Sequence, residues 1–353
     1  MHGLASSNKA SLSLTHFRFD LEIIMRINKL TLALAVAGVL AAGPAAASLT
    51  SFATFVGNVG YSSDGFGSIT QDGTISASVP AGSTVLAAYL YTGMNGFSGS
   101  TNPAGTTLAT NAVSFGPTVF NTTGCCSISS ARADVTSIVK PVIDGGAGGI
   151  YNFAVHEGSG GQDGEALVVV YQNAALPVST VGILDGFASV TGDTTSINFA
   201  SPLHPGDPGF FAEMIIGDNF SCCGQKSTIK VNGTVITENA GNSDDKTDSF
   251  DANGNLITVG GFNDPFSPML PDYATDHERY NLVPQIADGS TTITVDTVNA
   301  SQDDNIFMAT FYVSGKAGIN VPPPGPTVPE PASLALLGIG ALGFALSRRR
   351  RTV

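Results

Sequence analysis

The chain has 353 residues, enough for two ordinary domains, and only 12% of them are charged, whereas 42 are glycine. This composition, with many Thr, Ser, Asn and Val residues, favours an all-β exported protein over a helical one. The net charge is −13, and the region between the two ends holds 7 basic against 25 acidic residues. Such a surface does not follow a phosphate backbone, so we exclude nucleic acid as a partner.

The beginning of the chain predicts an export signal. A short basic stretch, an apolar run and three alanines precede Ser48. This is the pattern of a secretory signal peptide at residues 25–47, which we expect to engage the Sec translocon and to be cut by signal peptidase between Ala47 and Ser48. We interpret the mixed, polar residues 1–24 as a start-site overcall, with Met25 as the true start. The alternative is a genuine N-terminal extension with an internal signal anchor.

Strand-like patterns recur between the two ends. Nearly continuous apolar runs of six to eight residues, rich in β-branched and aromatic side chains, occupy residues 85–91, 166–171 and 306–313. Runs of this length and composition predict strands that are buried on both faces. Residues 228–236 alternate around Asn232 and Gly233, which predicts a hairpin, and residues 292–296 alternate in the same way.

Helical periodicity is nearly absent, and we expect only a turn or two at residues 133–139. A weak internal repeat is present, because the polar residues 162–165 before one apolar run recur, 140 residues later, at 302–305 before another. We therefore predict β-sandwich, jelly-roll-like halves at residues 48–180 and 181–318. The alternative is that the similarity arises by chance in a sequence of low complexity. The chain would then form a single sandwich.

Four cysteines form two adjacent pairs, Cys125 with Cys126 and Cys222 with Cys223. An exported chain meets an oxidising compartment, so we expect disulfides, for which three pairings exist. A bond within a pair is strained, because adjacent Cα atoms are closer than the usual disulfide range. Bonds between the pairs, which we favour, would close a loop of roughly a hundred residues and join the halves. Adjacent cysteines lack the spacing of a zinc site.

One acidic loop, residues 244–255, is rich in oxygen ligands and suggests a calcium site as an alternative to a solvated loop. Its candidate ligands are Asp248, Asp251, Asn253 and Asn255. An EF-hand does not fit, because Leu256 stands where that loop needs glycine and Phe262 where it needs glutamate. We expect no other cofactor.

Histidines beside carboxylates give no catalytic pattern. His156, His204 and His277 have acidic residues nearby, but none has the HExxH spacing and no GxSxG motif is present. We therefore expect no enzyme activity.

The end of the chain predicts a sorting signal. Residues 319–327 form a proline-rich linker, which is extended and semi-rigid. There follow Val328, Pro329, Glu330 and Pro331, an apolar segment at 332–347, and Arg348, Arg349, Arg350 and Arg351. A helix of 16 residues spans roughly 24 Å, less than the ~30 Å hydrocarbon core, and so suits a transient single transmembrane anchor with its basic cluster on the cytoplasmic side.

This order of features resembles the PEP-CTERM sorting tail, also called the ice-binding protein C-terminal domain, over residues 328–353. The resemblance implies an exosortase as partner and a Gram-negative bacterium that produces exopolysaccharide. It also implies a protein that is exported, anchored transiently in the inner membrane and then moved to the outer surface or beyond. It implies no ice binding. The rest of the chain loosely resembles secreted bacterial β-sandwich modules of unknown function.

Taken together, these features predict an exported cell-surface or extracellular-matrix protein with a structural or adhesive role in an exopolysaccharide or biofilm layer. A glycan- or calcium-binding module is the alternative, and a secreted hydrolase is the second alternative.

Overall fold

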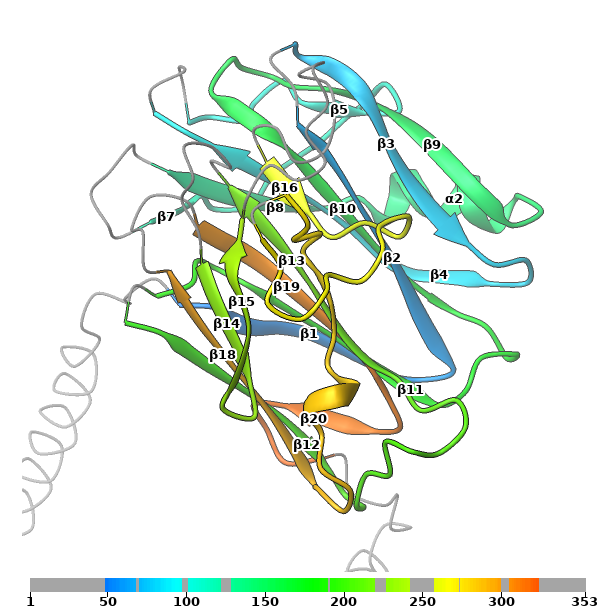
Figure 1. The fold of residues 1–353 in the computed structure, drawn as a ribbon. Coiled ribbons are helices and arrows are strands. Elements are labelled where there is room, and N and C mark those ends of the chain that lie inside the picture. The colour runs from blue at the N-terminus through cyan, green and yellow to red at the C-terminus, as the bar shows by residue number, and fades with distance from the viewer. Residues whose placement is uncertain are drawn as a thin grey trace, which may run out of the picture. The chain divides into compact units, whose positions relative to one another are not determined.

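Strands dominate the part of the chain that the computed structural model describes, which supports the mostly-β class expected from composition. That part comprises residues 48–67, 70–96, 101–121, 128–189, 191–219, 227–241, 257–272, 274–299 and 305–323. All of it belongs to one unit, Ala47–Val353, whose ribbon is drawn in Figure 1.

The strands form four antiparallel sheets, which we name by their position in the stack. The first outer sheet has the order β3 (Asp72–Val79), β9 (Gly149–His156), β5 (Thr107–Leu108) and β6 (Asn111–Ala112). The first inner sheet has the order β2 (Val59–Gly67), β10 (Gln162–Gln172), β4 (Thr84–Met94), β8 (Ser129–Asp134) and β7 (Val119–Phe120).

The other two sheets come mainly from the later part of the chain. The second inner sheet has the order β1 (Thr50–Gly57), β11 (Ser179–Asp185), β19 (Asn305–Ser314), β13 (Ala212–Asn219) and β16 (Ile257–Val259), with β17 (Arg279–Asn281) also paired to β13. The second outer sheet has the order β15 (Thr234–Ala240), β14 (Ser227–Val231), β18 (Thr292–Asn299), β12 (Asp193–Phe199) and β20 (Ala317–Ile319).

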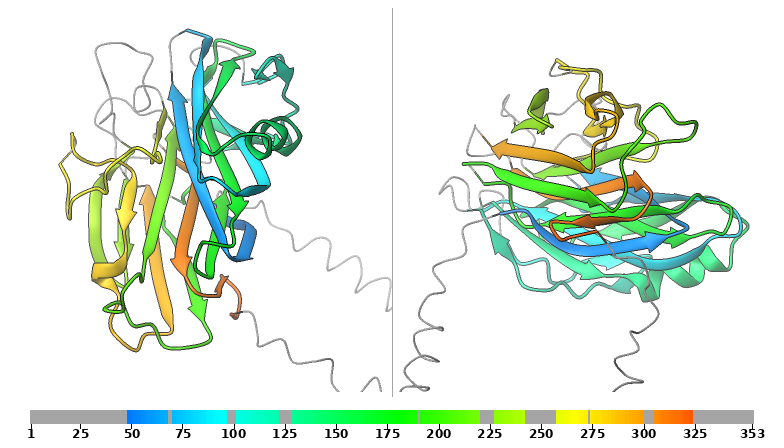
Figure 2. Two further views of the ribbon diagram at one scale, coloured as in Figure 1. Left: turned by 90° about the vertical axis from the view of Figure 1, so that its right-hand side faces the viewer. Right: turned by 90° about the horizontal axis from the view of Figure 1, so that it is seen from below.

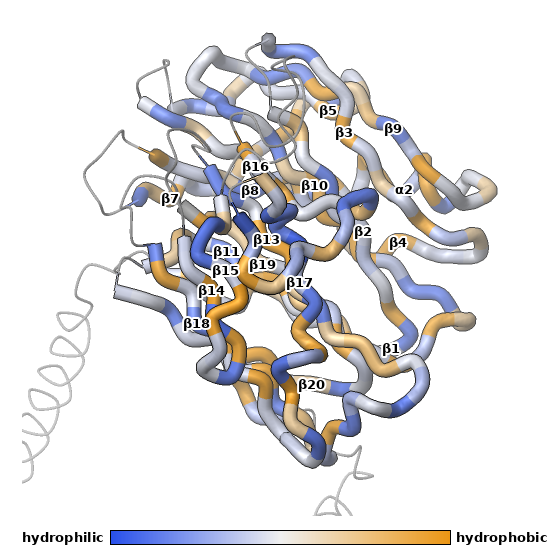
Figure 3. Tube along the Cα trace, in the orientation of Figure 1, coloured by the Kyte–Doolittle hydropathy of each residue, from blue (hydrophilic) through white to orange (hydrophobic). Residues whose placement is uncertain are grey.

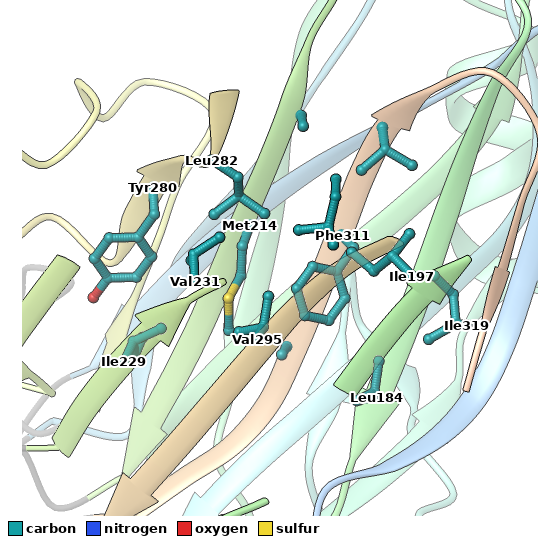
Figure 4. Packing of buried hydrophobic residues seen from close by; sticks show 14 of the residues in the cluster. Leu184, Ile197, Met214, Ile229, Val231, Tyr280, Leu282, Val295, Phe311 and Ile319 are labelled. Atoms are coloured by element: carbon teal, nitrogen blue, oxygen red, sulfur yellow. The ribbon is translucent and has the colours of Figure 1, made fainter. Parts of the chain in front are cut away.

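Three apolar cores lie between these four layers, which Figure 2 shows stacked face to face. The first half's core lies between the first outer and inner sheets, the central core between the two inner sheets, and the second half's core between the second inner and outer sheets. Figure 4 shows the last of these, where Met214 and Phe311 of the inner sheet pack toward Ile197 and Val295 of the outer sheet.

The central strands of the two inner sheets are buried on both faces. In β10, Leu167 and Val169 belong to the first half's core, whereas the alternating Val168 and Val170 belong to the central core. The predicted apolar runs are therefore confirmed as strands β4, β10 and β19 of the inner sheets. Outer strands such as β3 and β9 alternate instead, as the mixed colours along them in Figure 3 indicate.

The two halves repeat one pairing order. In the first half the neighbours are β2-β10-β4-β8 and β3-β9-β5-β6; in the second they are β11-β19-β13-β17 and β12-β18-β14-β15. These eight strands of the first half each have a counterpart that follows in the same order along the chain, as in an internal repeat, whereas β7 has no counterpart among the described strands in that pairing order. β1, the first described strand, lies within the predicted first half but pairs with β11 and extends the second inner sheet, and β20 pairs with β12.

The predicted hairpin at Asn232 and Gly233 is confirmed. These residues join β14 to β15 with φ of 49° and 81°, the left-handed values that a two-residue hairpin turn requires. The Asn232 side chain also accepts a hydrogen bond from the Thr294 amide at 2.9 Å, which ties the turn to β18. The strand predicted at residues 292–296 forms the first part of β18.

The predicted helix lies further along the chain than expected. α2 spans Thr136–Asp144 rather than residues 133–139, because the residues before it pair with β4 as strand β8. Asp134, the last residue of β8, accepts a hydrogen bond from the Thr136 amide at 2.9 Å and so marks the start of the helix. The corresponding place in the second half holds only a 3-10 turn, η1 (Val283–Gln285).

The predicted signal helix and C-terminal transmembrane helix lie outside the described residues. Within the part of the chain that the structure describes, no helix is long and apolar enough to cross a membrane.

Candidate functional site

Most residues singled out from the sequence fall outside the described ranges. These are Ala47, the calcium candidates Asp248, Asp251, Asn253 and Asn255, the cysteines Cys125, Cys126, Cys222 and Cys223, the motif Val328, Pro329, Glu330 and Pro331, and the cluster Arg348, Arg349, Arg350 and Arg351. Ser48 is described, and its hydroxyl donates a hydrogen bond to Asp193 Oδ1 at 2.7 Å. The first residue after the predicted cleavage position is thus held to the second outer sheet.

A buried carboxyl pair occupies one end of the first half's core. Glu165, on β10, is fully buried, and Glu157, directly after β9, is 2% exposed. Gln162 and Thr92 donate hydrogen bonds to Glu165 Oε1 at 2.8 Å and 3.3 Å. Glu157 Oε1 and Glu165 Oε2 are buried with no donor from the described residues, but the two carboxyl groups are themselves hydrogen-bonded partners. The pair is therefore joined by a shared proton.

The environment of this pair keeps it protonated. Burial raises the pKa of both carboxyl groups, and the charge of Glu165 raises the pKa of Glu157 further. The hydrogen bonds from Thr92 and Gln162 stabilise the charged form of Glu165 and so oppose the increase in its pKa. Nearby, burial raises the pKa of Asp163 to about 7, although Asn95 donates a hydrogen bond to it.

Two buried carboxyl groups of the second half, Asp276 and Glu278, lie among neutral donors instead. Asp276 is fully buried and accepts hydrogen bonds from the hydroxyls of Thr237 and of Ser267, the latter at 3.0 Å. Glu278, 1% exposed, accepts from the Gly241 amide and the Thr258 hydroxyl, both at 3.1 Å. Burial raises the pKa of Asp276, and the hydrogen bonds from Thr237 and Ser267 oppose the increase.

Two of the histidines considered in the sequence, His156 and His204, pair with exposed carboxylates instead. His156 Nδ1 lies 2.8 Å from Asp72 and His204 Nδ1 lies 2.8 Å from Asp288, and both pairs are exposed. Within the described ranges, no group of three or more His, Cys, Asp or Glu side chains is placed to hold a metal ion. The carboxyl groups that the structure does bring together belong to Glu157 and Glu165, which the sequence did not single out as a pair.

The sequence contained one signal for this pair. Glu165 directly precedes the apolar run 166–171 in the same strand, and a charged residue at such a position must find a partner when it is buried. Its partner, eight positions earlier on a different sheet, could not be read from the sequence.

The halves also meet through polar contacts beside the cysteine segments. Asn219 ends β13 in the second half, three residues before Cys222, and Ser129 begins β8 in the first half, three residues after Cys126. The Asn219 side-chain amide donates hydrogen bonds to the carbonyl of Ser129 at 3.1 Å and to that of Met94 at 3.3 Å. The described residues that border the two cysteine pairs, Asn219 and Ser129, are therefore in contact.

Comparison with known proteins bears on the tail alone. Residues 327–351 match the family model described as the PEP-CTERM protein-sorting motif. No curated protein and no solved structure matches the chain.

Proposed function

We propose that this chain, which carries the PEP-CTERM protein-sorting motif at residues 327–351, is a non-enzymatic structural or adhesive protein of an exopolysaccharide layer. The motif is the observation that carries the proposal. It is a signal that an exosortase recognises, and it belongs to proteins that are exported and anchored at the membrane before they are processed. The processed product would then remain at the outer surface or in the extracellular matrix.

The architecture of the exported part supports a structural role. Two inner sheets, whose central strands are buried on both faces, and three apolar cores give a body whose halves share one continuous interface. Arg132 of β8 strengthens this interface, because its guanidinium pairs with Asp185 of β11 and lies 3.3 Å from the ring centre of Phe52 in β1. Interlayer burial on this scale resists separation of the halves.

Disulfides between the cysteine pairs would add to this rigidity. Asn219 and Ser129, whose contact joins the halves, each stand three residues along the chain from one cysteine pair. This proximity favours bonds between the pairs over strained bonds within them. Such bonds would connect the halves covalently in an oxidising compartment.

The sorting step is tested by identifying the mature termini in cell fractions by mass spectrometry. We expect an exported product that begins at Ser48 and has lost Arg348 to Arg351. Replacing Glu330 and Pro331 with alanine should leave the intact tail in the inner membrane. The control Glu238→Ala, at an exposed position of β15, should be processed as the parent chain is. Full-length parent protein in the inner membrane of cells with a working exosortase would show that processing does not occur.

The matrix role is tested separately in cells that lack the gene. Complementation with the parent chain should restore the cohesion of the exopolysaccharide layer, and a chain with the Glu330 and Pro331 replacements should not. An unchanged layer in the deletion strain would exclude a structural role while leaving the sorting result intact.

A further inference from the structure

An apolar groove opens in the second half beside the end of β12. Its volume is about 690 Å³, and its apolar lining consists of Val178, Phe199, Pro202, Leu203 and Phe210. Val178 is 42% exposed and Phe210 is half-buried, so the groove presents apolar surface to the outside. Lys316, His204 and Asp207 stand among the polar residues that line it.

The chain leaves the fold directly toward this groove. β20 runs antiparallel to β12, and Asn320 then adopts a left-handed conformation with φ of 56° that turns the chain back. The backbone of Val321 and Pro322 passes so closely over Gly318 that a Cβ there would overlap the Pro322 carbonyl. The Asn198 side chain fixes the reversal by donating a hydrogen bond to the Val321 carbonyl at 3.0 Å.

After this reversal the chain follows β12 toward its C-terminal end. Pro322 and Pro323 line a second hollow of about 600 Å³, which also includes Asn198 and Phe199. Phe199 lines the apolar groove as well, together with the residues that follow it in the chain. The last described residue, Pro323, is half-buried and lines the hollow that shares Phe199 with the groove.

The chemistry of the following segment fits the groove. Residues 324–331, Pro-Gly-Pro-Thr-Val-Pro-Glu-Pro, are half proline and favour the extended polyproline II helix, which would reach about 25 Å at ~3.1 Å per residue. Segments of this kind bind in grooves lined by aromatic side chains, here Phe199 and Phe210. Glu330 is the only acidic residue after 323, and Lys316 is exposed without a carboxylate partner among the described residues.

We propose that this groove holds the chain's own residues 324–331, with Glu330 near Lys316, so that the sorting motif rests against the folded body until it is processed. Docking would compete with any enzyme that must bind the same segment in extended form. Rigid docking would also hold the body close to the membrane while the tail is anchored. The inference concerns the unprocessed chain and does not require that the exosortase step be correct.

The test is hydrogen exchange, measured by mass spectrometry on the unprocessed chain purified in detergent from cells without an exosortase. The amides of Gly325, Thr327, Val328 and Glu330 should exchange at least tenfold more slowly than in a free peptide of residues 324–331. Phe210→Ala and Lys316→Glu should each bring exchange close to the rate of the peptide. Combining Lys316→Glu with Glu330→Lys should restore the protection.

A matched control is Lys230→Glu, which makes the same charge change on β14 of the second outer sheet, away from the lining of the groove. It should leave the protection unchanged. The proposal is overturned if the parent segment exchanges at the rate of the free peptide, or if its protection survives both Phe210→Ala and Lys316→Glu. Protection that disappears on dilution would assign the groove to a second copy of the chain and would equally overturn it.

Discussion

The two halves share a pairing order but stabilise their buried acidic groups differently. In the first half, Glu157 and Glu165 lie together and share a proton, because burial raises the pKa of both. In the second half, Asp276 and Glu278 each accept hydrogen bonds from hydroxyl and amide donors. A repeated topology thus fixes where strands lie, whereas each half satisfies its buried charges with its own loops.

The halves also differ in how they are completed. The first has the helix α2, whose Val139 and Ile143 pack into its core, whereas the second has only the 3-10 turn η1 and gains the edge strands β1 and β20. Because β1 comes from the N-terminal end of the described chain, the second half's inner sheet is complete only when both ends of that chain have folded. These differences predict that the two halves unfold as one cooperative unit, whose stability depends on pH through the carboxyl pair of the first half.

The largest expected effect concerns the covalent connection of the halves. If the disulfides join the two cysteine pairs, reduction should lower the free energy of unfolding by up to ~4–5 kcal/mol, because each bond closes a loop of about a hundred residues in the unfolded chain. Urea unfolding of the oxidised and reduced protein measures the difference, and peptide mapping without reductant identifies the bonds. Bonds between Cys125 and Cys126, or free thiols, would show that the halves are joined by packing alone.

Next in size is the central core. Phe307, fully buried on β19, packs against Tyr91 of the first half with ring centres 6.2 Å apart. Phe307→Ala should cost about 3–5 kcal/mol through the cavity it leaves, and it should speed amide exchange in β4 as well as in β19. Val119→Ala, at a 41% exposed position in β7, should change stability by less than about 0.5 kcal/mol. If β4 keeps its parent exchange rates while β19 accelerates, the halves are not one cooperative unit.

The carboxyl pair predicts the direction of the pH dependence. Between the ordinary value of 4.5 and the raised pKa, about 8 for Glu165, the folded chain binds more protons than the unfolded chain. Stability is therefore greatest at the acidic side of this window and falls as the pH rises through it. Thermal unfolding between pH 5 and pH 9 measures the slope.

Replacing one member of the pair should reduce that slope. In Glu157→Gln the amide can donate the hydrogen bond that the shared proton provides, and it does not titrate. We therefore expect the free energy of unfolding to change less between pH 5 and pH 9 than in the parent, by about 2 kcal/mol. A remaining slope is expected from Asp64 and Asp163, whose pKa burial raises to about 7. Exposed Glu238→Gln serves as the control in the second half. A slope equal in the parent and in Glu157→Gln would mean that the pair does not titrate in this range.

The smallest effect is expected at the rim of the interface. Arg132→Ala removes the ion pair with Asp185 and the stacking on Phe52, both partly exposed, and should cost about 1 kcal/mol. Urea unfolding measures it, with Arg279→Ala as a comparison, since Arg279 makes a similar pair with Glu213 and stacks on Phe266, both of which are residues of the second half. Only Arg132→Ala should accelerate amide hydrogen exchange in β1. If Arg279→Ala accelerates it equally, Arg132 does not act specifically at the interface.

Local features were predicted well where a short pattern decides the structure. The three apolar runs became inner strands, because a strand covered on both faces needs no polar side. The hairpin followed from Asn232 and Gly233, which adopt the left-handed turn with little strain. The helix was misplaced by several residues, because pairing of β8 with β4 outweighed the local propensity of residues 133–135.

The sequence by itself determined the strand-rich class, the inner strands, the turn chemistry and the sorting tail, whose match at residues 327–351 depends on order and composition alone. Only the tertiary structure decided the stacking of four layers, the pairing of β1 with β11 and the meeting of Glu157 with Glu165. The reason is physical: burial and turn preferences act over a few residues, whereas pairings between segments far apart in the chain depend on how the apolar faces of whole sheets pack together.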